Sequence, residues 1–287
     1  MSDASTGLLA LALAVIFASA FSLIMKFSQE KQYSVLAVGG VNYIAAAIAA
    51  ALLVPWEHVT SVSSGMCLLA AVSGIGYLVT YLLLAHALRR RGITVPTAAV
   101  QVAMVVPLVP SVLLWHEHLA AVQATGVLFA VAAILLLAPP GGARAAGISR
   151  WAYLVVPMIF LTSGATRVAQ KAVTEFAPDG QQPVLALIWF ATAGIFSVGM
   201  MQVTGWPTRA GEWIAGVCLG GTNLGCLVFL LQALSLLPAV VAFPALSSLS
   251  LVIVSAAAFL LWNERHAWRA CVGIVMGILS VVLVSLR

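Results

Sequence analysis

A short basic stretch of the sequence has the residue types and spacing to bind an anion. Arg167 lies near the middle of an apolar run, and Gln170 and Lys171 follow it by three and four residues. Side chains at these spacings share one face of a helix. Guanidinium and ammonium groups bind carboxylates and phosphates through charge-assisted hydrogen bonds, so this face predicts a site for the negative group of a substrate. The alternative is structural: Arg167 and Lys171 extend to lipid head groups or pair with Glu175.

A second set of polar and aromatic side chains is predicted at mid-membrane depth. Tyr43, Tyr77, Gln101, Trp189 and Asn223 each fall near the middle of an apolar run. Tyr and Trp in membrane proteins gather at the two interfaces. Aromatic rings at mid-depth therefore favour a cavity wall for a mid-sized organic solute. The competing interpretations are core packing for the aromatic residues and an interhelical hydrogen bond for Asn223.

Other kinds of chemistry are disfavoured by the placement of the remaining reactive residues. All eight acidic residues lie at the ends of apolar runs or between them, so no carboxylate is expected at mid-membrane to relay protons or bind a cation. His86 is the remaining titratable candidate for proton coupling. The neighbours His116, Glu117 and His118 would point to different sides of a helix, which argues against a metal site. Since catalytic spacings and a phosphate-binding glycine loop are also missing, we expect no enzyme activity and no cofactor.

The elements that position these residues are predicted to be helices in a lipid bilayer. Hydrophobic residues make up 63% of the 287 and charged residues only 7%, more apolar surface than a water-soluble domain hides. A bilayer crossing needs about twenty apolar residues in a helix. Ten runs meet this length, which predicts an all-α membrane protein with ten transmembrane helices: 6–29, 34–55, 64–87, 93–115, 119–138, 151–175, 183–204, 211–234, 238–262 and 267–286. The four cysteines lie inside these runs without metal-ligand spacing, as small buried residues do.

The ten runs divide into two copies of one unit. Trp115 and Glu117 return 147 residues later as Trp262 and Glu264, and Gly126 returns as Gly273. We predict two five-helix repeats, 1–140 and 141–287. Because five is odd, the second repeat must be inverted in the membrane, which is the usual construction of an alternating-access carrier. A structural membrane subunit that merely duplicated is the alternative.

The acidic residue at each repeat has a predicted structural role, and the basic residues predict an orientation. Glu117 and Glu264 are expected to accept backbone amides at the starts of the helices that follow them, 119–138 and 267–286. The net charge of +5 comes mostly from Lys and Arg in short loops, which indicates membrane orientation and no nucleic-acid partner. Counting these residues loop by loop places both termini outside the cytoplasm.

The repeated five-helix pattern resembles that of a known protein family. The two five-helix units, with Glu117 and Glu264 at helix turns and Gly126 and Gly273 in the helices that follow, resemble the EamA-type members of the drug/metabolite transporter superfamily. The resemblance spans nearly the whole chain and implies a transporter with both termini in the cytoplasm, contrary to the charge count. Orientation therefore stays open. By length and layout alone, the YddG-like exporters of aromatic amino acids are the branch considered.

Our hypothesis is a secondary transporter of the bacterial inner (plasma) membrane that exports or exchanges a small organic solute, such as an amino acid or an anionic metabolite. The alternatives are an exporter of hydrophobic drugs and a lipid-handling or scaffold protein without solute flux. The expected partners are the substrate and the lipid bilayer, and we expect a monomer or a weak homodimer. The solute would lie between the two repeats, near Tyr43, Tyr77, Gln101, Arg167, Lys171, Trp189 and Asn223.

Overall fold

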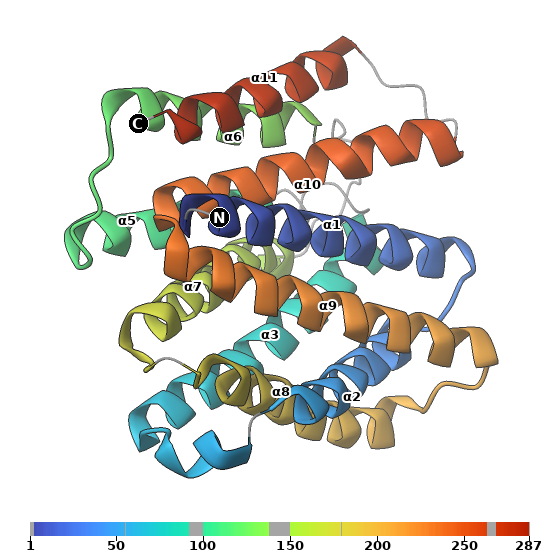
Figure 1. The fold of residues 1–287 in the computed structure, drawn as a ribbon. Coiled ribbons are helices and arrows are strands. Elements are labelled where there is room, and N and C mark those ends of the chain that lie inside the picture. The colour runs from blue at the N-terminus through green and yellow to red at the C-terminus, as the bar shows by residue number, and fades with distance from the viewer. Residues whose placement is uncertain are drawn as a thin grey trace. The chain divides into compact units, whose positions relative to one another are not determined.

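The computed structural model describes residues 3–54, 56–91, 100–137, 150–178, 180–262 and 268–286 (Figure 1). These residues form ten α-helices and one 3-10 helix, and they contain no strand. In chain order the elements are α1 (Asp3–Glu30), α2 (Val35–Leu53), η1 (Trp56–Ser61), α3 (Ser64–Arg91), α5 (Val105–Leu113), α6 (Ala121–Leu137), α7 (Arg150–Phe176), α8 (Gln182–Thr204), α9 (Ala210–Leu236), α10 (Ala239–Trp262) and α11 (Trp268–Ser285).

Most of the apolar runs fold into helices whose ends lie within a few residues of the runs. The run 183–204, for example, becomes α8, Gln182–Thr204, and the run 238–262 becomes α10, Ala239–Trp262. Lipid offers the backbone no hydrogen-bond partner, so a buried apolar run must pair its own amides in a helix. The Arg89 to Arg91 segment differs from expectation because α3 continues through it as helix. Arg is a strong helix former, and loss of hydrophobicity alone does not end a helix.

The run 93–115 is described only from residue 100 onward, and its helix is interrupted. Residues 100–102 are helical, a turn follows at 103–104, and α5 then begins at Val105. The amide of Val106 donates to the carbonyl of Ala103 at 3.1 Å, a tighter spacing than that of an α-helix. Pro107 follows directly and has no amide hydrogen to continue the α-helical pattern, which accounts for the break.

By contacts the chain forms two compact units, each drawn from both predicted repeats. Unit 1 contains Met1–Leu82 and Ala169–Leu236, and unit 2 contains Leu83–Val168 and Leu237–Arg287. Two of the boundaries fall inside helices α3 and α7. The repeats 1–140 and 141–287 are defined by sequence similarity and not by contacts, and this division stays a prediction.

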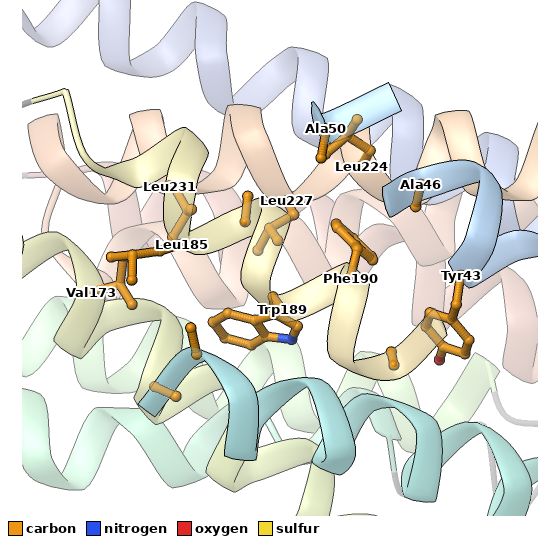
Figure 2. Close-up of a cluster of buried hydrophobic side chains, with 14 of the residues drawn as sticks. Tyr43, Ala46, Ala50, Val173, Leu185, Trp189, Phe190, Leu224, Leu227 and Leu231 are labelled. Carbon is orange, nitrogen blue, oxygen red and sulfur yellow. The ribbon is translucent and has the colours of Figure 1, made fainter. Parts of the chain in front are cut away.

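Unit 1 is built on long helices that pack against one another. Helix α1 lies beside α9, and α2 packs on both α8 and α9 (Figure 1). The side chains of Trp189 and Phe190 from α8 and Leu227 from α9 fill one buried core (Figure 2). A Cβ atom on Gly74 of α3 would lie 2.2 Å from the backbone carbonyl oxygen of Trp189. The close approach of α3 to α8 therefore requires glycine at this position.

In unit 2, α6 pairs with α11, and α10 contacts α5, α6 and α11. Figure 1 shows α6 and α11 side by side. The side-chain amide of Gln123 donates to the carbonyls of Val284 and Leu286, and so ties the start of α6 to the end of α11. A Cβ atom on Gly164 of α7 would lie 2.6 Å from side-chain atoms of Val106, so small size at Gly164 permits close packing on α5.

Glu117 has a structural role, but at a different helix from the one predicted. Its two carboxylate oxygens accept the backbone amides of Ala239 at 3.0 Å and Val240 at 3.2 Å. These amides begin α10, which lies 122 and 123 residues further along the chain. The predicted partner, the start of α6, instead uses Gln123, whose side-chain oxygen accepts the amide of Ala120. The prediction failed because a carboxylate caps whichever helix start the tertiary fold brings to it. Glu264 lies outside the described residues.

Five of the described helical segments are long and apolar enough to cross a membrane. They are Ala4–Glu30, Val35–Leu53, Ser64–Leu84, Gln182–Thr204 and Ala210–Leu236, all within unit 1 except the end of the third. Their outer faces carry exposed apolar side chains, such as Leu52 at 82% and Val203 at 89% exposure. Such surfaces are stable in contact with lipid and costly in water.

Candidate substrate-binding residues

Tyr77 of α3 is the centre of the polar and aromatic contacts in unit 1. Its ring meets Trp189 edge to face at 5.5 Å between centroids, and Phe190 in the same manner at 6.2 Å. Its hydroxyl accepts a 2.7 Å hydrogen bond from the side-chain amide of Gln170 in α7. Three helices therefore fix the position of this phenol, two of them through residues more than 90 positions away in sequence.

Two buried polar atoms beside Tyr77 have no hydrogen-bond partner among the described residues. They are the side-chain oxygen of Gln170, an acceptor, and the indole nitrogen of Trp189, a donor. Gln170 is 3% exposed and Trp189 is fully buried. A buried polar group that lacks a partner costs about 1–3 kcal/mol, and such groups are rare enough in proteins to call for an explanation. The cluster of Tyr77, Gln170 and Trp189 thus offers one donor and one acceptor to a polar molecule.

Tyr43 of α2 is held inside the same core. It is 3% exposed, its hydroxyl donates to the backbone carbonyl of Tyr77 at 3.1 Å, and its ring lies edge to face with Tyr81 at 5.9 Å. The Tyr81 hydroxyl in turn donates to the carbonyl of Val35 at the start of α2. These contacts give Tyr43 a packing role in the closed core, with its polar tip already bonded.

Lys171 and Asn223, two further predicted site residues of unit 1, both have polar partners. The Lys171 ammonium lies 2.5 Å from the Glu175 carboxylate, with side-chain exposures of 4% for Lys171 and 37% for Glu175. The side-chain amide of Asn223 donates to the side-chain oxygen of Asn42 at 3.3 Å, which joins α9 to α2. Lys171 would have to leave Glu175 to bind another anion.

Among the predicted site residues in unit 2, Arg167 has a side chain held by several contacts. Its guanidinium donates to the Ser247 hydroxyl at 3.0 Å and to the Val100 carbonyl at 3.3 Å, and it lies over the Phe243 ring at 6.0 Å from the centroid. These three contacts fix the orientation of the guanidinium group. The small residue Gly164, one turn earlier, lets α7 approach α5 closely enough to hold this arrangement.

Gln101, predicted from its depth in the sequence, follows the Val100 carbonyl that accepts from Arg167. It is partly buried, and its own backbone carbonyl accepts the amide of Met104 in the turn before α5. The two residues thus belong to one segment of unit 2. The side chain of His86 lies outside the described residues. Across the residues that the structure describes, no group of three His, Cys, Asp or Glu side chains could hold a metal ion.

The sequence profile of the EamA-like transporter family matches residues 5–138 and again residues 150–286. The chain belongs to the EamA-like transporter family. Members of this family are membrane transporters and not enzymes, so the described helices are those of an integral membrane protein. Comparison with curated proteins gives no match.

Solved structures share this transporter's fold. One crystal structure superimposes with a TM-score of 0.69 over 98% of this chain and 96% of its own, at 18% sequence identity. At that identity the match establishes the fold alone.

Some residues that contact Tyr77 or Arg167 in this EamA-like transporter are not among the site residues predicted from the sequence. From the sequence, Gln170 is only a neighbour of Arg167 on one helix face, and the sequence pattern does not point to Ser247 or Phe190. A signal existed for Gln170, because a neutral amide inside an apolar helix is itself costly without a partner. Ser247 gave no signal, since a serine inside a transmembrane helix usually bonds its own backbone.

Proposed function

We propose that this transporter is a secondary carrier that exports or exchanges a small organic solute, such as an amino acid or an anionic metabolite, by alternating access. The observation that carries the proposal is the unpaired donor and acceptor beside Tyr77. A solute that both donates and accepts hydrogen bonds would satisfy the indole nitrogen of Trp189 and the side-chain oxygen of Gln170. The gain of those two bonds would favour the bound state over the empty one.

Arg167 in unit 2 supports the proposal by a separate observation, because a guanidinium group binds the negative group of an anionic solute. Its Ser247 and Val100 contacts already fix the guanidinium, so little rotamer entropy remains to be lost when an anion binds. In unit 1, Lys171 would contribute by exchanging Glu175 for the solute. Tyr43, Gln101 and Asn223 are proposed as supporting residues of their respective units.

The test is solute flux in proteoliposomes that contain the purified protein. Counterflow of radiolabelled amino acids and small carboxylic acids is measured for the wild type, for Arg167→Ala and for Arg287→Ala, which removes a cation at the chain terminus. We expect flux in the wild type and in Arg287→Ala, and strongly reduced flux in Arg167→Ala. Equal flux in Arg167→Ala removes the anion-binding role, and absence of flux for every solute class overturns the carrier proposal.

A second candidate function is the export of hydrophobic drugs. One observation favours it: the unit 1 core brings together the aromatic rings of Tyr43, Tyr77, Tyr81, Trp189 and Phe190. If this core opened to a solute, its rings would bind apolar ring systems without any cation. Efflux of a fluorescent lipophilic dye that continues in Arg167→Ala, with no amino acid flux in the wild type, would select this alternative.

We further propose that the two repeats are inverted. Two observations support this: the family profile matches each half of the chain separately, and α2 packs on its sequence counterpart α8, as α6 does on α11. Single cysteines at the exposed positions Gln32 and Pro178, 146 residues apart, test it in a cysteine-free background. A membrane-impermeant maleimide should label the two positions from opposite sides. Labelling from the same side contradicts inversion, and the side that labels Gln32→Cys also fixes the orientation of the termini.

The location proposed for this transporter is the inner membrane of a bacterium. Bacterial outer membranes are spanned by β-barrels, whereas the described part of this chain is helical. The YddG-like branch of aromatic amino acid exporters is one specific form of the proposal. The flux assay tests it directly if tryptophan and phenylalanine are included among the labelled solutes.

A further inference from the structure

A half-open apolar groove runs between the end of α1 and the start of α9 in unit 1. Its volume is about 360 Å³. Ile24 and Phe27 line it from α1, Ile214, Ala215 and Cys218 line it from α9, and Tyr33 of the α1–α2 connection also lines it. Figure 1 shows the two helices side by side along their length. The groove plays no part in the contacts of Tyr77 or Arg167.

Two exposed cations lie at the end of the helices where the groove is found. The Lys31 ammonium lies over the ring of Phe27, 5.5 Å from its centroid, and Phe27 lines the groove. Arg209 immediately precedes α9. Both side chains are exposed. The groove therefore combines an apolar trough with positive charge at one end.

Two acidic residues, Glu212 and Glu30, lie at the same end of these helices. Glu212 is 4% exposed, and its carboxylate accepts the backbone amides of Ser34, Thr208 and Arg209 at 2.8, 2.9 and 3.2 Å. This carboxylate accepts amides at the starts of α2 and α9, and its charge also attracts Arg209. Glu30, which neighbours Lys31 in sequence, is exposed. Exposed charges are screened by solvent and remain able to exchange partners.

Aromatic residues place this end of the helices at the membrane surface. The rings of Trp206 and Trp213 stack with centroids 6.4 Å apart, and their exposures are 41% and 44%. Partly exposed Trp and Tyr residues at helix ends mark the level of the lipid head groups. An apolar groove that begins at this level and runs toward the membrane centre has the geometry of an acyl chain with its head group outermost.

We propose that the groove binds an anionic phospholipid, with an acyl chain along Ile24, Ile214 and Cys218 and the phosphate group near Lys31 and Arg209. Lipid surrounds this face of an integral membrane protein, and the two cations, Lys31 and Arg209, favour an anionic head group over a zwitterionic one. The Lys and Arg count predicts that this end faces the cytoplasm, where the leaflet is richer in anionic lipid.

The experiment is native mass spectrometry of the full-length protein titrated with phosphatidylglycerol or phosphatidylcholine of the same acyl chains. We expect the wild type to retain phosphatidylglycerol preferentially. Lys31→Gln and Arg209→Gln should each weaken its binding about fivefold, the effect of one cation near a lipid surface.

A second pair of variants tests the groove itself. Cys218→Trp places a large side chain in the groove and should abolish retention of both lipids, while Val203→Trp adds the same bulk to an exposed position on α8 and should not. Unfolding temperatures are measured for all variants, so that lipid loss is compared only between folded proteins. Equal retention of the two lipids by the wild type, or retention unchanged in Cys218→Trp, overturns the proposal. A dimer that dissociates in Cys218→Trp without any lipid loss would identify a second copy of the chain as the occupant, and would also overturn it.

Discussion

The surroundings of Tyr77 in unit 1 and of Arg167 in unit 2 hold polar groups in different ways. Around Tyr77 the positions are set by packed rings from α3 and α8, and two buried polar atoms have no hydrogen-bond partner among the residues that the structure describes. Around Arg167 the position of the guanidinium group is set by hydrogen bonds to Ser247 and Val100. Packing selects for shape and bonding pattern, whereas a fixed cation selects for charge. The two regions would therefore discriminate between solutes by different properties.

The largest expected effect tests the packed character of the Tyr77 region. Gly74→Val should destabilise the protein by about 3 kcal/mol or more, because the new Cβ meets a backbone carbonyl that cannot rotate away. The atoms nearest to a Cβ at Gly164 in unit 2 belong to the side chain of Val106 and not to the backbone, so we expect a smaller loss for Gly164→Val, about 1–2 kcal/mol. Thermal unfolding of the purified proteins measures both.

Gly199→Val is the control for these two variants, because a Cβ at Gly199 has no atom within 4 Å. It should unfold within a few degrees of the wild type. A larger loss for Gly164→Val than for Gly74→Val would contradict the inference that close packing of α3 on α8 sets the position of Tyr77.

The next effect tests charge selection at Arg167. Arg167→Gln should reduce flux of an anionic solute roughly 10- to 150-fold, as expected for loss of a hydrogen bond to a charged group. Arg167→Lys should restore part of this flux, because lysine returns the positive charge. It lacks the planar set of N–H donors with which a guanidinium group can bind two acceptors at once. Flux of an uncharged analogue should change little in either variant. If both solutes lose flux equally, Arg167 supports the fold and does not select for charge.

A smaller effect tests the unpaired atoms beside Tyr77. Trp189→Phe removes the indole donor while keeping an aromatic ring, and it should lower flux about 2- to 13-fold, the value of one neutral hydrogen bond. Stability should stay level or rise, because an unsatisfied buried donor is removed. Phe190→Leu, which alters a Tyr77 contact without any polar atom, should instead lower stability. Unchanged flux in a stable Trp189→Phe protein would exclude the indole as a solute contact.

The smallest effect concerns Asn223, whose partner in the described structure is Asn42. Asn223→Ala should cost about 1 kcal/mol of stability, as for one neutral hydrogen bond. A double-mutant cycle with Asn42→Ala measures the coupling directly. Coupling near zero, together with a specific loss of flux, would move Asn223 from a packing role to a solute-binding role.

The helices were largely predictable from the sequence, and the reason is local. A run such as 211–234 becomes α9, Ala210–Leu236, because apolar backbone in lipid must bond within its own segment. The interruption before α5 was less predictable, since Pro107 indicates a bend but not where the hydrogen bonds shift. The continuation of α3 through Arg91 is not predictable from hydrophobicity, because three arginines follow the apolar run 64–87.

The candidate site was only partly predictable. Tyr77, Trp189 and Arg167 were predicted from their depth in the membrane, and in the structure each of these side chains makes specific contacts. Depth could not select their partners Gln170 and Ser247, which lie 93 and 80 residues away from the groups that they bind. No local spacing encodes a contact of that range.

The sequence by itself determined the solvent, the helices and the family, because these follow from composition, run length and repeated motifs. The tertiary structure alone decided which helix each polar group serves. Glu117 shows the difference most clearly: its place at a helix end was evident from the sequence, yet the amides that it accepts belong to α10 and not to the helix that follows it. A carboxylate bonds to whichever unpaired amides packing places within reach, and packing is a property of the whole chain.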